Sequence, residues 1–143
     1  MSRDNVIEIK NLDKIYVTKN GDVHALDNVD LQVYHQEFIT CVGQSGCGKT
    51  TTGRAILQLY KPTAGSIMFE GKDLTALNGK EMRAMRRQIQ VIFQDPYGSL
   101  NPRMTCGDIV GEPLTVHKLT DNKADYRARV EYLLDTVGLN PYM

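Results

Sequence analysis

The alternation of apolar and polar residues predicts an antiparallel β layer near the start of the chain. Residues 6–9 and 14–17 are short strand candidates, and Asn20-Gly21-Asp22 is a strong turn signal after them. Val29, Leu31 and Val33 then alternate with polar residues, which is the period of a half-buried strand. A further apolar strand is expected at residues 67–69, closed by Gly71. We therefore expect a β subdomain from residues 4–35 and 66–75.

Two continuous apolar runs, residues 38–42 and 89–93, predict buried strands of a different kind. Such runs are typical of strands covered on both faces, as in an α/β core. A helix over residues 49–60 is expected after the first run, and residues 61–65 form a stop and a turn. Residues 36–65 and 76–94 are expected to form this core.

The rest of the chain is expected to be helical, with a loop at residues 95–102, where turn-forming residues dominate. Helices are predicted at residues 80–88, from about residue 105 to Pro113, and at residues 124–137, capped by Gly138. The first helix carries cations that suggest a phosphate-binding face, but we interpret them as solvated: Lys80, Arg83, Arg86 and Arg87. The last helix has an apolar stripe interpreted as core packing: Tyr126, Val130, Leu133, Leu134 and Val137.

One motif lies between the first apolar run and the helix that follows it: Gly43-Gln44-Ser45-Gly46-Cys47-Gly48-Lys49-Thr50. This spacing matches the P-loop, in which glycines let successive backbone N–H groups surround a phosphate at a helix N-terminus. Lys49 would reach the outer phosphates, and the Thr50 hydroxyl would ligate Mg²⁺. Cys47 lies beside the lysine at the start of a helix, a setting typical of reactive cysteines, whereas Cys41 lies in the predicted apolar strand.

Composition excludes several classes of function. The chain has 143 residues, and its 17 basic and 17 acidic residues cancel, so it has no bulk attraction to nucleic acid or to an anionic membrane. Three cysteines without a close pair argue against a disulfide framework or a zinc site and favour a reducing compartment. The polar first residues do not resemble a signal peptide, and no apolar run is long enough to span a membrane. We expect a soluble protein whose membrane role, if it has one, depends on a partner.

With residues 92–105, Ile-Phe-Gln-Asp-Pro-Tyr-Gly-Ser-Leu-Asn-Pro-Arg-Met-Thr, the P-loop and Tyr16 carry a family resemblance. The sequence resembles the nucleotide-binding subunit of ABC transporters, and more narrowly the importers of oligopeptides, dipeptides, nickel and glutathione. The resemblance covers essentially the whole chain. It implies an α/β P-loop NTPase fold with an antiparallel β subdomain, a partial α/β core and, at residues 95–143, the start of a helical subdomain.

The resemblance also implies roles for individual residues and for partners. Tyr16 would stack on adenine, and Gln94 would sense Mg²⁺ and the attacking water as a metal ligand and catalytic residue, together with Lys49. The full set expected to bind ATP is Tyr16, Gly43, Gln44, Ser45, Gly46, Cys47, Gly48, Lys49, Thr50 and Thr51. Transmembrane importer subunits would dock on the region after Gln94, and a second nucleotide-binding subunit would complete a dimer. The protein would then lie in the cytoplasm, peripheral to the inner membrane.

The sequence departs from the family pattern chiefly by what it does not contain. The family's Ser-Gly-Gly-Gln signature, the strand ending in Asp-Glu and the switch histidine are missing, so we interpret residues 1–143 as a single truncated nucleotide-binding domain. Such a chain is expected to bind ATP without hydrolysing it. Two other hypotheses remain open at this point: a small P-loop kinase, tested by phosphate transfer to small acceptors, and a non-catalytic module that binds a membrane partner.

Overall fold

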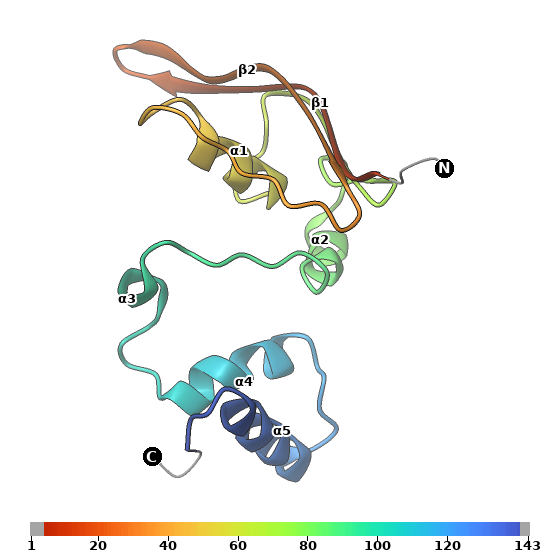
Figure 1. Cartoon of the computed structure of the whole chain (residues 1–143), viewed down its shortest axis with the longest axis vertical. Coiled ribbons are helices and arrows are strands. Elements are labelled where there is room, and N and C mark those ends of the chain that lie inside the picture. Colours follow the sequence, from red (N-terminus) through yellow and green to blue (C-terminus); the bar gives the residue numbers. More distant parts are fainter. Residues whose placement is uncertain (1–4, 141–143) are drawn as a thin grey trace. The chain divides into compact units, whose positions relative to one another are not determined.

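The computed structural model describes residues 5–140, and the chain divides into two compact units, Met1–Ile89 and Gln90–Met143 (Figure 1). Each unit is described by itself below. Residue 4, where the predicted β subdomain begins, and residues 141–143, at the end of the predicted helical segment, lie outside the described residues.

The first unit is built on a four-stranded antiparallel sheet. Its strands are β1 (Asn5–Thr18), β2 (Gly21–Tyr34), β3 (Ala64–Phe69) and β4 (Lys72–Asp73), in the order β2-β1-β3-β4. The first two strands form a long hairpin, and Gly21 accommodates a φ of +115° at its turn, which favours glycine. The predicted antiparallel β layer is confirmed, but the two early strand candidates are one strand.

A polar cluster explains why that single strand looked like two. Asn11 and Asn28 have positive φ values of 47° and 48°, and the β1–β2 register shifts around them. The Asn11 N–H donates to Asp30 Oδ1 at 2.7 Å, and the Asn28 N–H donates to Asp13 Oδ1 at 2.7 Å. These side chains satisfy backbone groups at the irregularity, so the strand continues through a stretch that reads as a break.

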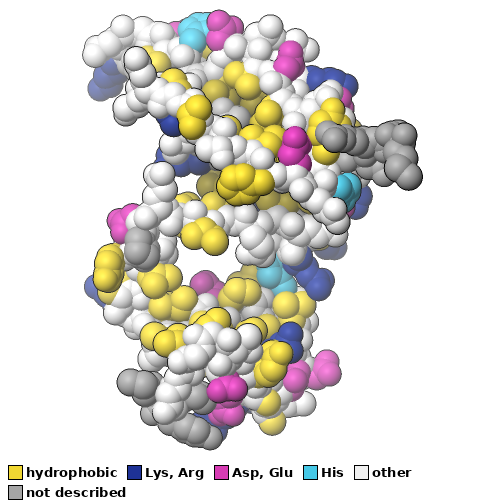
Figure 2. All heavy atoms as spheres, viewed as in Figure 1, with side chains coloured by type: hydrophobic (Ala, Val, Ile, Leu, Met, Phe, Trp, Pro, Cys, Tyr) yellow, Lys and Arg dark blue, Asp and Glu magenta, His cyan; other side chains and the backbone are white. Residues whose placement is uncertain are grey.

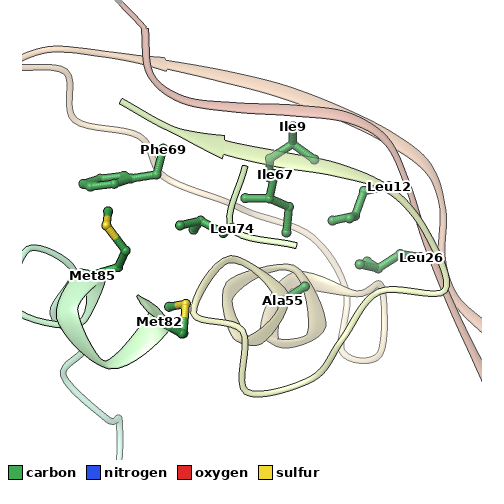
Figure 3. Packing of buried hydrophobic residues seen from close by; sticks show 9 residues of the cluster. All are labelled: Ile9, Leu12, Leu26, Ala55, Ile67, Phe69, Leu74, Met82 and Met85. Carbon is green, nitrogen blue, oxygen red and sulfur yellow. The ribbon is translucent and has the colours of Figure 1, made fainter. Parts of the chain in front are cut away.

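Two helices, α1 (Lys49–Ile56) and α2 (Gly79–Met85), cover one face of this sheet. Figure 3 shows their buried side chains facing those of the strands. The core contains Ile9, Leu12, Leu26, Ala55, Ile67, Phe69, Leu74, Met82 and Met85. Helix α1 ends at Ile56, not at residue 60 as predicted, because Gln58 takes a positive φ of 52° and its Nε2 donates to the Ala55 carbonyl. Helix α2 is shorter than its predicted range of 80–88, so two of the four predicted cations lie beyond its last residue. All four are exposed: Lys80 and Arg83 in the helix, and Arg86 and Arg87 after it.

The predictions of buried strands at residues 38–42 and 89–93 are wrong. Neither segment, called here the two unpaired runs, is a strand in the described part of the chain, and apolar side chains lie open to solvent there. Phe38 is 92% exposed, Val42 85% and Ile92 97%. Figure 2 shows hydrophobic side chains at several places on the face in view. A buried central strand needs hydrogen-bonded neighbours, and no described residue pairs with either run.

The second unit contains α3 (Pro96–Ser99), α4 (Cys106–Val116) and α5 (Lys123–Thr136). Helices α4 and α5 pack against each other through Leu114, Val130 and Leu134 (Figure 1). The stripe predicted on the last helix is therefore confirmed as core packing except at Val137, which is 68% exposed. Gly138 follows α5 with a φ of +76°, as expected for a C-terminal cap.

Two boundaries in this unit differ from the predictions. The expected loop at residues 95–102 contains the short helix α3, because the Asp95 carboxylate accepts the N–H groups of Tyr97 and Gly98 at 3.0 Å. Helix α4 continues through Pro113 instead of ending there. Beyond the proline, Leu114 is buried against α5, although the missing proline N–H removes one hydrogen bond of the helix. Among the described helices, none combines the length and the apolar character needed to cross a membrane.

Candidate phosphate-binding site

The P-loop residues form a compact turn between the end of the first unpaired run and α1. Gly48 is the N-cap of α1, with a φ of +93°. A Cβ at this position would lie 2.8 Å from the Ala25 carbonyl oxygen of β2 and 3.0 Å from Leu26 Cδ2. At the other end of the turn, a Cβ on Gly43 would lie 2.7 Å from Cys47 Sγ. The packing of the loop on β2 therefore requires glycine at position 48, whereas a Cβ at position 43 would meet only side-chain atoms of the loop itself.

The Lys49 side chain folds back into this loop. Its Nζ donates to the carbonyl oxygens of Gly43 and Gln44, both at 2.8 Å, and lies 3.3 Å from Cys47 Sγ. The Cys47 N–H donates to the Gln44 carbonyl at 3.3 Å and closes the turn. The ammonium group is thus held at the loop by carbonyl oxygens, and its flexible side chain lets it turn from them toward a bound anion.

The first turn of α1 faces this charge with its N–H groups still available. No side chain caps the helix within the described part of the chain, and its first intrahelical bond runs from the Thr52 N–H to the Gly48 carbonyl at 2.8 Å. The N–H groups of Lys49, Thr50 and Thr51 precede that bond, so they are the ones a helix start offers to an anion. Of the two threonines that follow Lys49, Thr50 is exposed and Thr51 is half-buried.

Residues 44–47 of the loop, Gln44, Ser45, Gly46 and Cys47, are all exposed. The predicted loop residues are therefore brought together around one ammonium group and one helix start. No group of three or more His, Cys, Asp or Glu side chains suited to a metal occurs among residues 5–140. Of the two predicted metal ligands, Thr50 lies in this loop and Gln94 lies in the second unit.

Tyr16 lies in β1, in the same unit as the loop and close to it along the sheet. Its register partner is Val23, and Lys14, two residues earlier, pairs with Leu26, the residue that abuts Gly48. Two residues along a strand span about 7 Å. The Tyr16 ring is half-buried and meets the Tyr60 ring edge-on, with centroids 6.1 Å apart and planes at 88°. Sequence reasoning missed Tyr60, because nothing in the local pattern joins it to a strand so far away in the chain.

Gln94 lies in the second unit, exposed, directly after the second unpaired run. The structure describes the two units separately, so the role expected for Gln94 beside the phosphates stays a prediction. The same holds for the assignment of the individual loop residues to nucleotide and metal.

The profile of the ABC transporter family matches residues 26–143, and the chain therefore belongs to that family. Among curated proteins, it is 46% identical over 138 residues to the oligopeptide transport ATP-binding protein OppF of Bacillus subtilis, covering 96% of this chain and 45% of that protein. It is 51% identical over 138 residues to the dipeptide transport ATP-binding protein DppF of Lactococcus lactis, covering 94% of this chain and 44% of that protein. The chain thus spans less than half the length of these relatives.

Solved structures agree with this family. The dimeric bacterial ABC transporter cassette MJ0796 is 29% identical, with a TM-score of 0.75, covering 90% of this chain and 56% of that one. A post-hydrolysis state of the same cassette, bound to ADP and Pi, gives a TM-score of 0.74 at 28% identity, with the same coverage of both chains. The predicted ABC-type fold class is confirmed, with the exception of the two core strands corrected above. A small P-loop kinase of another family is not favoured.

Proposed function

We propose that this chain binds ATP with Mg²⁺ at the P-loop, and that the whole protein to which it corresponds is the ATPase subunit of a peptide importer. The observation that carries the proposal is the Lys49 ammonium held by the Gly43 and Gln44 carbonyls at the uncapped start of α1. The names of the similar proteins, oligopeptide and dipeptide transport ATP-binding proteins, support the substrate class.

In this proposal, each part of the site has one task. Backbone N–H groups of the loop and those at the start of α1, on Lys49, Thr50 and Thr51, bind phosphate oxygens, and the Lys49 ammonium neutralises the outer phosphates. The Thr50 hydroxyl and the Gln94 side-chain oxygen hold the metal. When bound, Mg²⁺ neutralises charge on the phosphate oxygens and orients them for attack by water. Tyr16 provides the surface on which the base stacks.

The proposal extends to the organisation of the chain and to its partners. Residues 4–35 and 66–75 act as the β subdomain, residues 36–65 and 76–94 as part of the ATP core, and residues 95–143 as the start of the helical subdomain. The region after Gln94 docks on transmembrane importer subunits at the cytoplasmic face of the membrane. A second nucleotide-binding subunit completes the site, in keeping with the dimeric cassette to which the fold is similar.

Titration of the full chain with Mg·ATP tests the binding step. We expect saturable, Mg²⁺-dependent binding that weakens at least tenfold in Lys49→Ala, because the carbonyl-lined loop then has no charge to offer the phosphates. Lys72→Ala is the matched control, since Lys72 is an exposed lysine on β4 of the same unit. An equal loss of Mg·ATP affinity in both variants, or an unchanged affinity in Lys49→Ala, contradicts the proposal.

A phosphate-release assay on the same samples tests the catalytic step. The 143 residues contain no family carboxylate to polarise water, and removal of a catalytic base typically slows a reaction about 10²–10⁴-fold. We therefore expect no turnover above background. Steady hydrolysis that disappears in Lys49→Ala would show that these residues supply a base of their own.

A further inference from the structure

The segment that follows α1 is fastened along β1 beside Tyr16. The Thr63 N–H donates to the Asp13 carbonyl at 2.8 Å, and the Ile15 N–H donates to Thr63 Oγ1 at 3.0 Å. The Lys14 Nζ donates to the Lys61 carbonyl at 2.8 Å. Three hydrogen bonds therefore fix residues 61–63 against residues 13–15, and they set the position of the residue just before them, Tyr60.

Tyr60 contacts Tyr16 next to these three hydrogen bonds. The two rings form a T-shaped pair, and Lys14 Nζ lies 5.0 Å from the Tyr16 ring centroid. Contacts of this kind restrict the rotation of a half-buried tyrosine that would otherwise move freely on the sheet surface. A surface fixed before binding loses less side-chain entropy when a ligand stacks on it.

Tyr60 is in turn attached to the helix that begins at the P-loop. The Arg54 guanidinium lies 5.7 Å from the Tyr60 ring centroid, and its terminal nitrogen donates to the Tyr60 hydroxyl at 3.4 Å. Arg54 lies in the last turn of α1, whose first residue is Lys49. A continuous set of contacts thus runs from the phosphate loop through α1 and Tyr60 to Tyr16.

We infer that Tyr60 is a positioning residue for nucleobase binding, which orients Tyr16 and, through Arg54, fixes the base surface relative to the phosphate loop. The inference rests on the proposed function, because it presupposes a nucleotide whose phosphates bind the P-loop. A base stacked on Tyr16 lies parallel to that ring, so the 88° angle makes the plane of the base perpendicular to the plane of Tyr60. We therefore expect Tyr60 to contribute to the binding of the base and not to the binding of the phosphates.

The test compares two ligands of the full chain, Mg·ATP and Mg·tripolyphosphate, which has the phosphates without the base. We expect Tyr60→Ala to weaken ATP binding about three- to tenfold, as loss of one aromatic pair predicts, and to leave tripolyphosphate binding unchanged. Tyr60→Phe, which keeps the ring, should bind ATP nearly as wild type does. In the Tyr16→Ala background, Tyr60→Ala should have no further effect, because there is no ring left to orient.

A matched control comes from the second unit, where Arg129 lies 5.3 Å from the ring centroid of Tyr132. Tyr132→Ala removes the same kind of Arg–Tyr pair and should change neither affinity. Equal weakening of both ligands by Tyr60→Ala, no weakening of ATP, or additive effects of Tyr16→Ala and Tyr60→Ala would each overturn the inference. If the wild-type chain binds Mg·ATP and Mg·tripolyphosphate equally well, the inferred base-binding surface is refuted and the proposed phosphate site is not. If the chain binds neither ligand, the proposed function is refuted as well.

Discussion

Replacing Gly48 by alanine should damage both the fold of the first unit and its phosphate loop. The position has a φ of +93°, and holding a residue other than glycine in such a conformation costs about 1–3 kcal/mol. The new Cβ would also lie 2.8 Å from the Ala25 carbonyl, a backbone atom that moves only if β2 moves. We therefore expect a loss of at least about 2 kcal/mol, or a fall in Tm of about 8–16 °C for a domain of this size.

The chain offers a matched control five residues further on. Gly53 lies inside α1, and a Cβ there would meet nothing within 4 Å. Gly53→Ala should stabilise the helix by up to about 1 kcal/mol, so its Tm should rise. Thermal unfolding followed by circular dichroism measures both variants. If Gly48→Ala melts at or above the wild-type temperature, or if both variants fall equally, the packing of the loop on β2 described here is wrong.

Three further outcomes follow from particular contacts. Cys47, whose sulfur lies 3.3 Å from the Lys49 ammonium, should react with iodoacetamide several-fold faster than Cys41, and Mg·ATP should protect it; equal rates by mass spectrometry would contradict this. The two unpaired runs should cause concentration-dependent association in sedimentation experiments, and a strict monomer that melts at one temperature at all concentrations would argue against it. Hydrogen bonds from the Thr105 side chain and backbone lower the pKa of Asp108 in the folded chain. The Asp108 carboxylate therefore stabilises the fold fully above its unfolded pKa of about 3.9. This stabilisation is lost as the pH falls through the lower pKa of the folded chain. Thr105→Ala should raise the pKa of Asp108 in an NMR titration, and an unchanged value would exclude the capping box as its cause.

Local chemistry made the hairpin, the P-loop turn and the packed last helix predictable from the sequence. A turn such as Asn20-Gly21 and a cap such as Gly138 depend on residues only a few positions away, and glycine is the residue that their φ angles require. Leu134 and Val130 recur at helical spacing and find their partner in the neighbouring helix.

The misreadings involve interactions that the local pattern does not contain. The two unpaired runs have the composition of buried strands, but a strand is defined by the neighbour to which it is hydrogen-bonded, and no described residue is that neighbour. Cys41, expected in a buried strand, is exposed for the same reason. The contact between Tyr16 and Tyr60 depends on the register of residues 61–63 along β1, which only the folded structure reveals.

Amide NMR spectroscopy of the full chain during titration with Mg·ATP tests the central claim most directly, since it reports where the nucleotide binds. The account predicts that the largest shift changes fall on the amides of residues 43–51, with smaller ones at Tyr16 and Tyr60. Mg·tripolyphosphate should reproduce the changes in the loop and omit those at the two tyrosines. Changes confined to other residues, or none in the loop at saturating nucleotide, would contradict the assignment of this loop as the phosphate site.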